Sequence, residues 1–200
     1  MMRLDQTIRF RRRNLPHWEI KGARYFVTVR CAGSLPRDVV ERLQEIQLQL
    51  QAIEPGSEEF AAMQRAYFFT MEKYLDGSSA QEGLLRDPVA ARAVILEFDL
   101  LAEWRIEVSH FSVMPNHWHA LIKPREDCTH SLGETMKRVK GRSAKAIRRQ
   151  CGGSGAVWQR EWFDRWVRDE AEWTKIVDYI HNNPVKARLA PTWRDHPWTR

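Results

Sequence analysis

Residues 113–122 read VMPNHWHALI, and this stretch decides which fold the chain adopts. Pro115 and Asn116 are typical turn residues, and they separate two segments rich in apolar and β-branched side chains, residues 105–114 and 117–123. The pattern predicts two antiparallel strands joined by a short turn. The apolar face of such a hairpin can pack on the helices that are predicted on either side of it.

The second strand of this hairpin carries two histidines, His117 and His119, with Trp118 between them. Because side chains alternate across a strand, the two imidazoles point to one face while Trp118 points to the other. Two imidazoles on one face can hold a divalent metal ion. A His-x-His pair also occurs without a metal, so a purely structural role for the pair stays open. His110, in the preceding strand, is expected to be a core or surface histidine.

Working outward, the rest of the chain alternates between helical and strand-like patterns. Residues 25–31 and 157–167 read as strands. Apolar periodicity and capping signals predict helices over residues 39–53, 57–75, 87–102, 132–150 and 170–183. Pro184 is expected to help end the last of them. This order predicts a single α+β domain over residues 1–200, with helices packed on an antiparallel sheet and residues 36–103 as a helical insertion between the first strand and the hairpin.

The last predicted helix carries a tyrosine and an amide at its edge. One apolar stripe should face the core, formed by Trp173, Ile176, Val177 and Ile180. Tyr179 and Asn183 are four residues apart, so they lie one above the other beside that stripe and can face a cleft. The Asn183 oxygen could coordinate a hard cation near Tyr179. The alternative is that Tyr179 is a tyrosine at the core boundary and Asn183 a C-terminal cap.

A tyrosine beside a metal suggests phosphodiester chemistry. A free phenol has a pKa near 10 and is a poor nucleophile at neutral pH. A divalent ion on the scissile phosphate withdraws charge and stabilises the transition state. In-line attack by Tyr179 would form a 5′-phosphotyrosine and release a 3′-hydroxyl, and the reverse attack would rejoin DNA without ATP. A metal-dependent hydrolase that uses water instead would tolerate Tyr179→Phe.

The composition favours a polyanionic partner. The 200 residues contain 32 Lys and Arg against 26 Asp and Glu, a net charge of +6. A merely basic protein without such a partner would show the same surplus. The three cysteines are far apart and form no CxxC motif, which favours a reducing cytosol over a disulfide framework. No apolar run approaches the roughly 20 residues of a membrane helix, so we expect a cytoplasmic protein and no membrane partner.

Basic residues gather in the helix predicted over residues 132–150. Seven cations and no acid fall within 13 residues, and all but Lys140 lie on one side of the helix. We expect this stripe to bind a phosphate backbone; its members are Lys137, Arg138, Arg142, Lys145, Arg148 and Arg149. A flexible N-terminal arm that includes Arg9, Arg11, Arg12 and Arg13 could add a second contact. Three tryptophans could stack on unpaired bases but are more often core residues, and they stay unassigned: Trp18, Trp158 and Trp162.

Together these motifs resemble a known family. Residues 114–119 (MPNHWH) resemble the HUH motif, histidine–bulky hydrophobic–histidine, of single-tyrosine HUH transposases. Residues 179–187 (YIHNNPVKA) resemble the tyrosine helix of the REP-associated members. Shorter segments are also similar to that subgroup, namely residues 85–88, 155–160, 163–164 and 197–198. The resemblance is close from about Leu84 to the C-terminus and extends to the first strand.

The resemblance implies a ferredoxin-like HUH fold with about four or five strands and a Mg²⁺ or Mn²⁺ site. His117, His119 and Asn183 would be the metal ligands and Tyr179 the nucleophile, although some relatives carry Gln where this chain has the shorter Asn183. It also implies cleavage and rejoining of single-stranded DNA, at palindromic repeats folded as hairpins, by a monomer or a homodimer. The alternative is a domesticated, non-catalytic protein that only binds structured nucleic acid.

Overall fold

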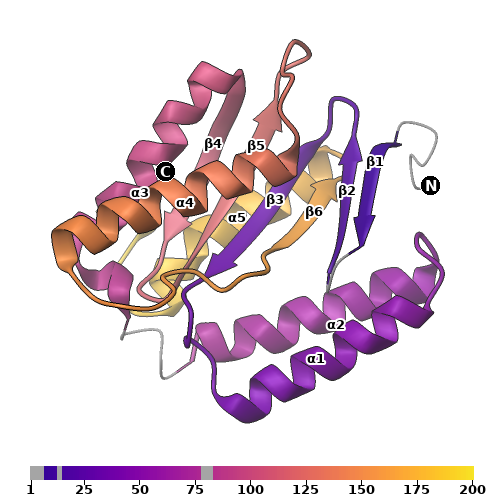
Figure 1. Ribbon diagram of the computed structural model, residues 1–200, viewed down its shortest axis with the longest axis horizontal. Coiled ribbons are helices and arrows are strands. Elements are labelled where there is room, and N and C mark those ends of the chain that lie inside the picture. Colours follow the sequence, from indigo (N-terminus) through magenta and orange to yellow (C-terminus); the bar gives the residue numbers. More distant parts are fainter. Residues whose placement is uncertain (1–6, 13–14, 78–82) are drawn as a thin grey trace.

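The computed structural model describes residues 7–12, 15–77 and 83–200. Four strands form an antiparallel sheet in the order β4–β5–β3–β6 (Figure 1). They are β3 (Arg24–Arg30), β4 (Ile106–Val113), β5 (His117–Pro124) and β6 (Phe163–Val167). β4 and β5 form the predicted hairpin. β3 lies between β5 and β6 and pairs with both.

Two helices connect these strands and cover one face of the sheet. They are α3 (Pro88–Leu100), between β3 and β4, and α4 (Leu132–Cys151), between β5 and β6. The resulting order β3–α3–β4–β5–α4–β6 is the ferredoxin-like arrangement. The predicted α+β fold with helices packed on an antiparallel sheet is therefore confirmed. The last helix, α5 (Glu170–Lys186), lies on the opposite face, behind the sheet in Figure 1.

The alternation predicted for β5 separates two cores. Trp118 and Ile122 are fully buried in the core under α3 and α4, together with Val27 and Val29 of β3. Leu121 is fully buried in the other core, which α5 covers. His117 and His119 share the parity of Leu121 and therefore lie on the α5 face.

A pair of helices joins this second core from the segment before α3. α1 (Arg37–Ala52) and α2 (Glu58–Leu75) lie side by side at the bottom of Figure 1. The side chain of Ser57 accepts a hydrogen bond from the backbone N–H of Phe60 and so begins α2 as a cap. Residues 36–103 thus contain the α1–α2 pair on one side of the sheet and α3, which completes the ferredoxin-like order, on the other. No helix of the described ranges is both long and apolar enough to cross a membrane.

Arg9, Arg11 and Arg12 belong to a strand rather than to a flexible arm. β1 (Thr7–Arg12) pairs with β2 (Pro16–Ile20) in a separate antiparallel hairpin. The sequence pattern does not predict this hairpin, because β1 has few apolar residues and they alternate with arginines. A hydrogen bond links this hairpin to the main sheet: the backbone N–H of Ile20 donates to the hydroxyl of Tyr25 in β3 at 2.7 Å.

Two element boundaries also differ from the prediction. β6 begins only at Phe163, and of residues 157–162 only Trp158 makes a β-bridge, to Cys31. Pro184 does not end α5, which continues to Lys186. The last turn stays hydrogen-bonded around the proline because the N–H of Ala187 donates to the carbonyl of Asn183 at 3.0 Å.

Candidate metal and nucleophile site

The two histidines of β5 converge in the interior beneath α5. His117 and His119 have no exposed surface, and their Nε2 atoms lie 2.9 Å apart. The opposite ring nitrogens are held in place, with His117 Nδ1 2.5 Å from Asn116 Oδ1 and His119 Nδ1 2.8 Å from Thr28 Oγ1. Because Asn116 Oδ1 can only accept, the His117 Nδ1–H donates to it and leaves the Nε2 lone pair for a ligand.

Both imidazoles are neutral at neutral pH. Burial, together with the neighbouring His119, lowers the pKa of His117 to about 3. Burial likewise lowers the pKa of His119 to about 3. The neutral ring is the form that binds a metal ion, so the pair is already in the ligating state.

Glu72 of α2 completes a cluster that the sequence analysis missed. Its Oε2 atom lies 3.4 Å from His119 Nε2, and one ligand atom from each of Glu72, His117 and His119 falls within 4.8 Å of the others. Burial raises the pKa of the Glu72 carboxyl group. One signal could have found it, since Glu72 follows Met71 and precedes Leu75 by three residues, on a helix face that is otherwise apolar and buried.

Tyr179 of α5 reaches this cluster, as the sequence analysis expected. Its hydroxyl donates a hydrogen bond to Glu72 Oε2, and its ring centroid lies 5.3 Å from that of His119. Burial, together with the carboxylates of Glu72 and Asp76, raises the pKa of the phenol well above 10, while the amide of Asn183 acts in the opposite direction. The hydroxyl is therefore protonated at neutral pH unless a positive charge enters the site.

Asn183 lies fully buried one turn after Tyr179. Within the described ranges neither polar atom of its side chain has a hydrogen-bond partner, and Glu72 Oε1 has none either. Asn183 is not a C-terminal cap, because α5 ends at Lys186 and Ala187 takes that position. Buried polar atoms without a partner are costly, and a cation bound by the imidazoles, the carboxylate and the amide oxygen would satisfy Glu72 Oε1 and Asn183 Oδ1. The residues present therefore fit a divalent metal ion.

A cavity of about 550 Å³ opens beside the nucleophile candidate. Tyr179 lines it together with residues of α2 and β6, including Phe68 and Trp166. The phenol thus lies between Glu72, His117 and His119, which could hold a metal ion (the metal-ligating cluster), and a space that a substrate could enter.

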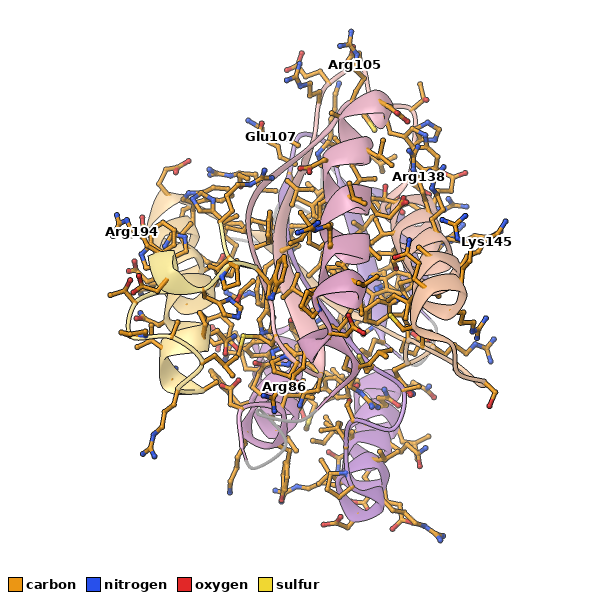
Figure 2. The ribbon with its side chains drawn as sticks, turned by 90° about the vertical axis from the view of Figure 1, so that its left-hand side faces the viewer. Arg86, Arg105, Glu107, Arg138, Lys145 and Arg194 are labelled. Carbon is orange, nitrogen blue, oxygen red and sulfur yellow. The ribbon has the colours of Figure 1, made fainter. Side chains whose placement is uncertain are left out.

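The basic stripe of α4 lies on the other side of the sheet. The side chain of Arg138 is only 9% exposed and binds Glu97 of α3 and Glu103, while Arg142 also binds Glu97. Arg148 donates to the carbonyl of Gly155. Lys137, Lys145 and Arg149 are exposed and have no ion pair among the residues that the structure describes; Lys145 projects outward from α4 in Figure 2. Acids on neighbouring elements, which the helix alone could not reveal, neutralise part of the expected stripe.

The remaining residues that the sequence analysis considered lie outside the cluster of Glu72, His117 and His119. Arg11 is exposed on β1, Arg12 belongs to the same strand, and Arg13 lies outside the described residues. Of the unassigned tryptophans, Trp18 and Trp158 are each 6% exposed, and Trp162 stacks on His17 with ring centroids 4.3 Å apart. His110 stays apart from the metal-ligating cluster, with its ring centroid 5.5 Å from that of His181.

Comparison with known proteins identifies the family to which this fold belongs. A family model described as transposase IS200 like matches residues 81–183, more than half of the chain. The chain belongs to the IS200-like transposase family. This family match includes the histidine pair, Tyr179 and Asn183, but Glu72 and the α1–α2 pair precede it.

Two relatives come from Haemophilus influenzae. One, named a REP-associated tyrosine transposase, is 23% identical over 97 residues, which cover 44% of this chain and 54% of that protein. The other, uncharacterized, is 25% identical over 101 residues, covering 40% of this chain and 56% of that protein. The chain thus spans about half the length of the curated relatives it matches.

The fold is similar to that of a REP-associated tyrosine transposase whose solved structure holds a REP hairpin. The TM-score is 0.55 at 18% sequence identity, and the likeness covers 92% of this chain and 79% of that one. At this identity the likeness shows the shared fold alone.

Proposed function

We propose that this protein is a metal-dependent single-strand DNA transposase or endonuclease that cleaves and rejoins DNA through a 5′-phosphotyrosine. One observation carries the proposal, namely that Tyr179 donates its hydroxyl hydrogen bond to Glu72 within the cluster that contains His117 and His119. Membership of the IS200-like transposase family supports the same reaction class.

His117, His119 and Glu72 would hold a Mg²⁺ or Mn²⁺ ion, with Asn183 as a further ligand. When bound, the ion would supply positive charge to the scissile phosphate and so stabilise its transition state. Asn116 and Thr28 orient the two imidazoles for this task.

Tyr179 would carry out the cleavage. Its phenolic oxygen forms a bond to the phosphorus, the bond from phosphorus to the 3′-oxygen breaks, and the 3′-oxygen leaves as a hydroxyl after taking a proton. The Glu72 carboxylate already accepts the hydrogen bond from the phenol and can receive its proton. The phosphotyrosine is itself a phosphodiester. Attack by a 3′-hydroxyl on its phosphorus therefore rejoins the strand and releases the phenol.

Single-stranded DNA that folds as a hairpin is the substrate we propose. The related solved transposase was bound to a REP hairpin. In this chain the net charge of +6 and the cavity beside Tyr179 support a nucleic-acid strand that reaches the phenol from outside.

A covalent-adduct assay tests the proposal. The protein is incubated with Mn²⁺ and a pool of hairpins whose single-stranded flanks have randomised sequence, labelled at either the 3′ or the 5′ end. We expect only the 3′-labelled strand to become attached to protein on a denaturing gel, because the 5′-phosphate of the downstream fragment binds Tyr179. Tyr179→Phe should abolish the adduct, while Tyr67→Phe, another buried phenol of the same core, should keep it.

The other outcomes point to the alternatives. Salt-sensitive binding without cleavage in either metal would support the non-catalytic binding protein. If the DNA is cleaved without any adduct, and Tyr179→Phe still cleaves it, a hydrolase that uses water would be supported.

A further inference from the structure

The cavity beside Tyr179 has aromatic walls that the cleavage reaction itself does not use. Phe68 and Phe69 of α2 line it next to the nucleophile candidate, and the ring of Phe68 lies 5.8 Å from that of Tyr179 and 5.7 Å from that of Phe69. Trp166 of β6 lines the cavity as well. These rings make a continuous path of π faces and edges from the phenol outward.

Phe69 is the unusual member of this path. It leaves 64% of its surface exposed on a helix whose neighbouring rings are packed into the protein. A single exposed apolar side chain is common and needs no explanation. Here, however, the exposed ring borders a cavity of about 550 Å³, within the range of roughly 300–1,000 Å³ that is typical of small-molecule sites.

The charges around the cavity suit an anionic ligand. Its two buried acids already have partners, since Glu172 binds Arg165 and Arg168, and Asp164 binds His17. Arg65 and Lys175, in contrast, are exposed on α2 and α5 and form no ion pair within the part of the chain that the structure describes. Glu58, at the start of α2, is the remaining acid of the lining. The cavity therefore offers two cations that are free to bind a phosphate.

An aromatic wall with free cations at its edge matches the parts of a nucleotide. Bases stack on aromatic side chains regardless of their sequence, and the backbone phosphates bind Lys and Arg. Gln64, which also lines the cavity, can both donate to and accept from the edge of a base.

We propose that this cavity binds one unpaired nucleotide next to the scissile phosphate, with its base against Phe68 and Phe69 and its phosphate facing Arg65 and Lys175. The inference rests on the proposed function, because that function places the scissile phosphate at Tyr179. It adds a task for α2, which would present Glu72 to the metal-ligating cluster and an aromatic wall to the substrate.

Photo-crosslinking locates the bound base without any need for catalysis. Oligothymidylate that carries 5-iododeoxyuridine is bound to the wild-type protein in EDTA, irradiated, and the crosslinked peptides are sequenced by mass spectrometry. We expect crosslinks at Phe68, Phe69 or Trp166. Crosslinks confined to α4 or to the β1–β2 hairpin would overturn the proposal.

Affinity measurements on matched variants give an independent test. Phe69→Ala should weaken binding of oligothymidylate by roughly 5-fold to 100-fold, the range that stacking on one aromatic ring supplies, and Phe69→Trp should restore it. Leu48→Ala is the control, because Leu48 is 65% exposed on the neighbouring helix α1 and lies outside the cavity. Equal affinities for Phe69→Ala and Leu48→Ala would overturn the proposal.

The two proposals fail in different ways. If a Tyr179 adduct forms but the crosslinks avoid the cavity, the nucleotide site is wrong and the proposed reaction stands. If the crosslinks map to the cavity and no adduct forms with any metal, the nucleotide site stands and the reaction is wrong.

Discussion

Glu72 and Tyr179 are joined by a hydrogen bond although they lie 107 residues apart, one on α2 and the other on α5. The bond links the helix pair that precedes the family match to the helix that carries the nucleophile candidate. It also keeps the phenol protonated, because the Glu72 carboxylate contributes to the rise in the pKa of Tyr179. Without a positive charge in the site, the phenol therefore stays protonated and is a weak nucleophile.

Replacing Glu72 should weaken metal binding. Glu72→Gln removes the carboxylate charge beside His117 and His119 at nearly constant volume, and we expect the affinity for Mn²⁺ to fall at least about tenfold, as measured by isothermal titration calorimetry. Glu97→Gln is the matched control. Glu97 is 7% exposed, close to the 5% of Glu72, but it lies on α3 across the sheet. An unchanged affinity in Glu72→Gln would remove Glu72 from the metal site.

Thr28 should affect the affinity for a metal ion although its side chain is not one of the proposed ligands. Its hydroxyl lies 2.8 Å from His119 Nδ1 and fixes the orientation of that ring. Thr28→Val keeps the shape and deletes the hydroxyl, so we expect a loss of about 10- to 100-fold in Mn²⁺ affinity while the circular dichroism spectrum stays unchanged. Equal metal affinity for Thr28→Val and the wild type would show that the ring needs no such support.

Gly83 should be intolerant of a side chain. It has a φ of +148°, and a Cβ atom there would lie 2.1 Å from the carbonyl oxygen of Pro115, in the turn that precedes His117. Gly83→Ala should lower the free energy of unfolding by roughly 1–3 kcal/mol or displace that turn. Gly152→Ala separates the effect of the positive φ from that of the close contact. Gly152 also has a positive φ, +75°, but has no atom within 4 Å of the added Cβ. Thermal unfolding that shows the same loss in both variants would mean that the close contact has no effect.

The stability of the protein should fall at alkaline pH because of His17. Burial alone would lower the pKa of this imidazole, but Asp164 and Glu161 outweigh it and raise the pKa to about 9. The unfolded value is near 6.5, so the protonated ring stabilises the fold fully below pH 6.5 and this contribution is lost as the pH rises through 9. Urea unfolding between pH 6.5 and 10 should show the decline.

His17→Gln should flatten that decline. His196→Gln should retain it, because burial lowers the pKa of His196 and its imidazole therefore loses no proton in the folded protein as the pH rises through 9. A decline of the same size in His17→Gln would assign the effect to another group.

The basic helix should divide into structural and binding cations. Lys137, Lys145 and Arg149 are exposed without ion pairs in the described ranges, so their joint replacement by Gln should reduce the salt dependence of DNA binding by about one unit of slope for each lost phosphate contact. Arg138→Gln should instead lower stability and leave the slope unchanged, because Arg138 is buried against Glu97 and Glu103. Filter binding at several salt concentrations distinguishes the two, and an unchanged slope in the triple variant would move the DNA to another surface.

The parts of the site that follow local periodicity could be predicted from the sequence. The alternation in β5 placed His117 and His119 on one face, and the spacing along α5 placed Tyr179 and Asn183 together. Both rules act over fewer than ten residues, where backbone geometry alone decides which side chains share a face.

The parts that depend on distant partners could not be predicted. Glu72 lies 45 positions before His117 in an amphipathic helix, and only tertiary packing brings the two together. The ion pairs of Arg138 require Glu97 and Glu103 from a neighbouring helix and its 3₁₀ extension. Pro184 does not end the helix because the N–H groups after it still find acceptors within the last turn, as that of Ala187 does in the carbonyl of Asn183.

The strict alternation of β5 has a further consequence for how this chain can change. Trp118 anchors one core while the imidazoles on either side of it face the other, so one inserted residue after the Pro115–Asn116 turn would exchange these roles. The indole would then lie on the side of Glu72 and Tyr179, and at least one imidazole would be buried among the apolar side chains under α3 and α4. The same few residues thus determine both the packing of the core and the position of the two imidazoles. An insertion or deletion there would disrupt both.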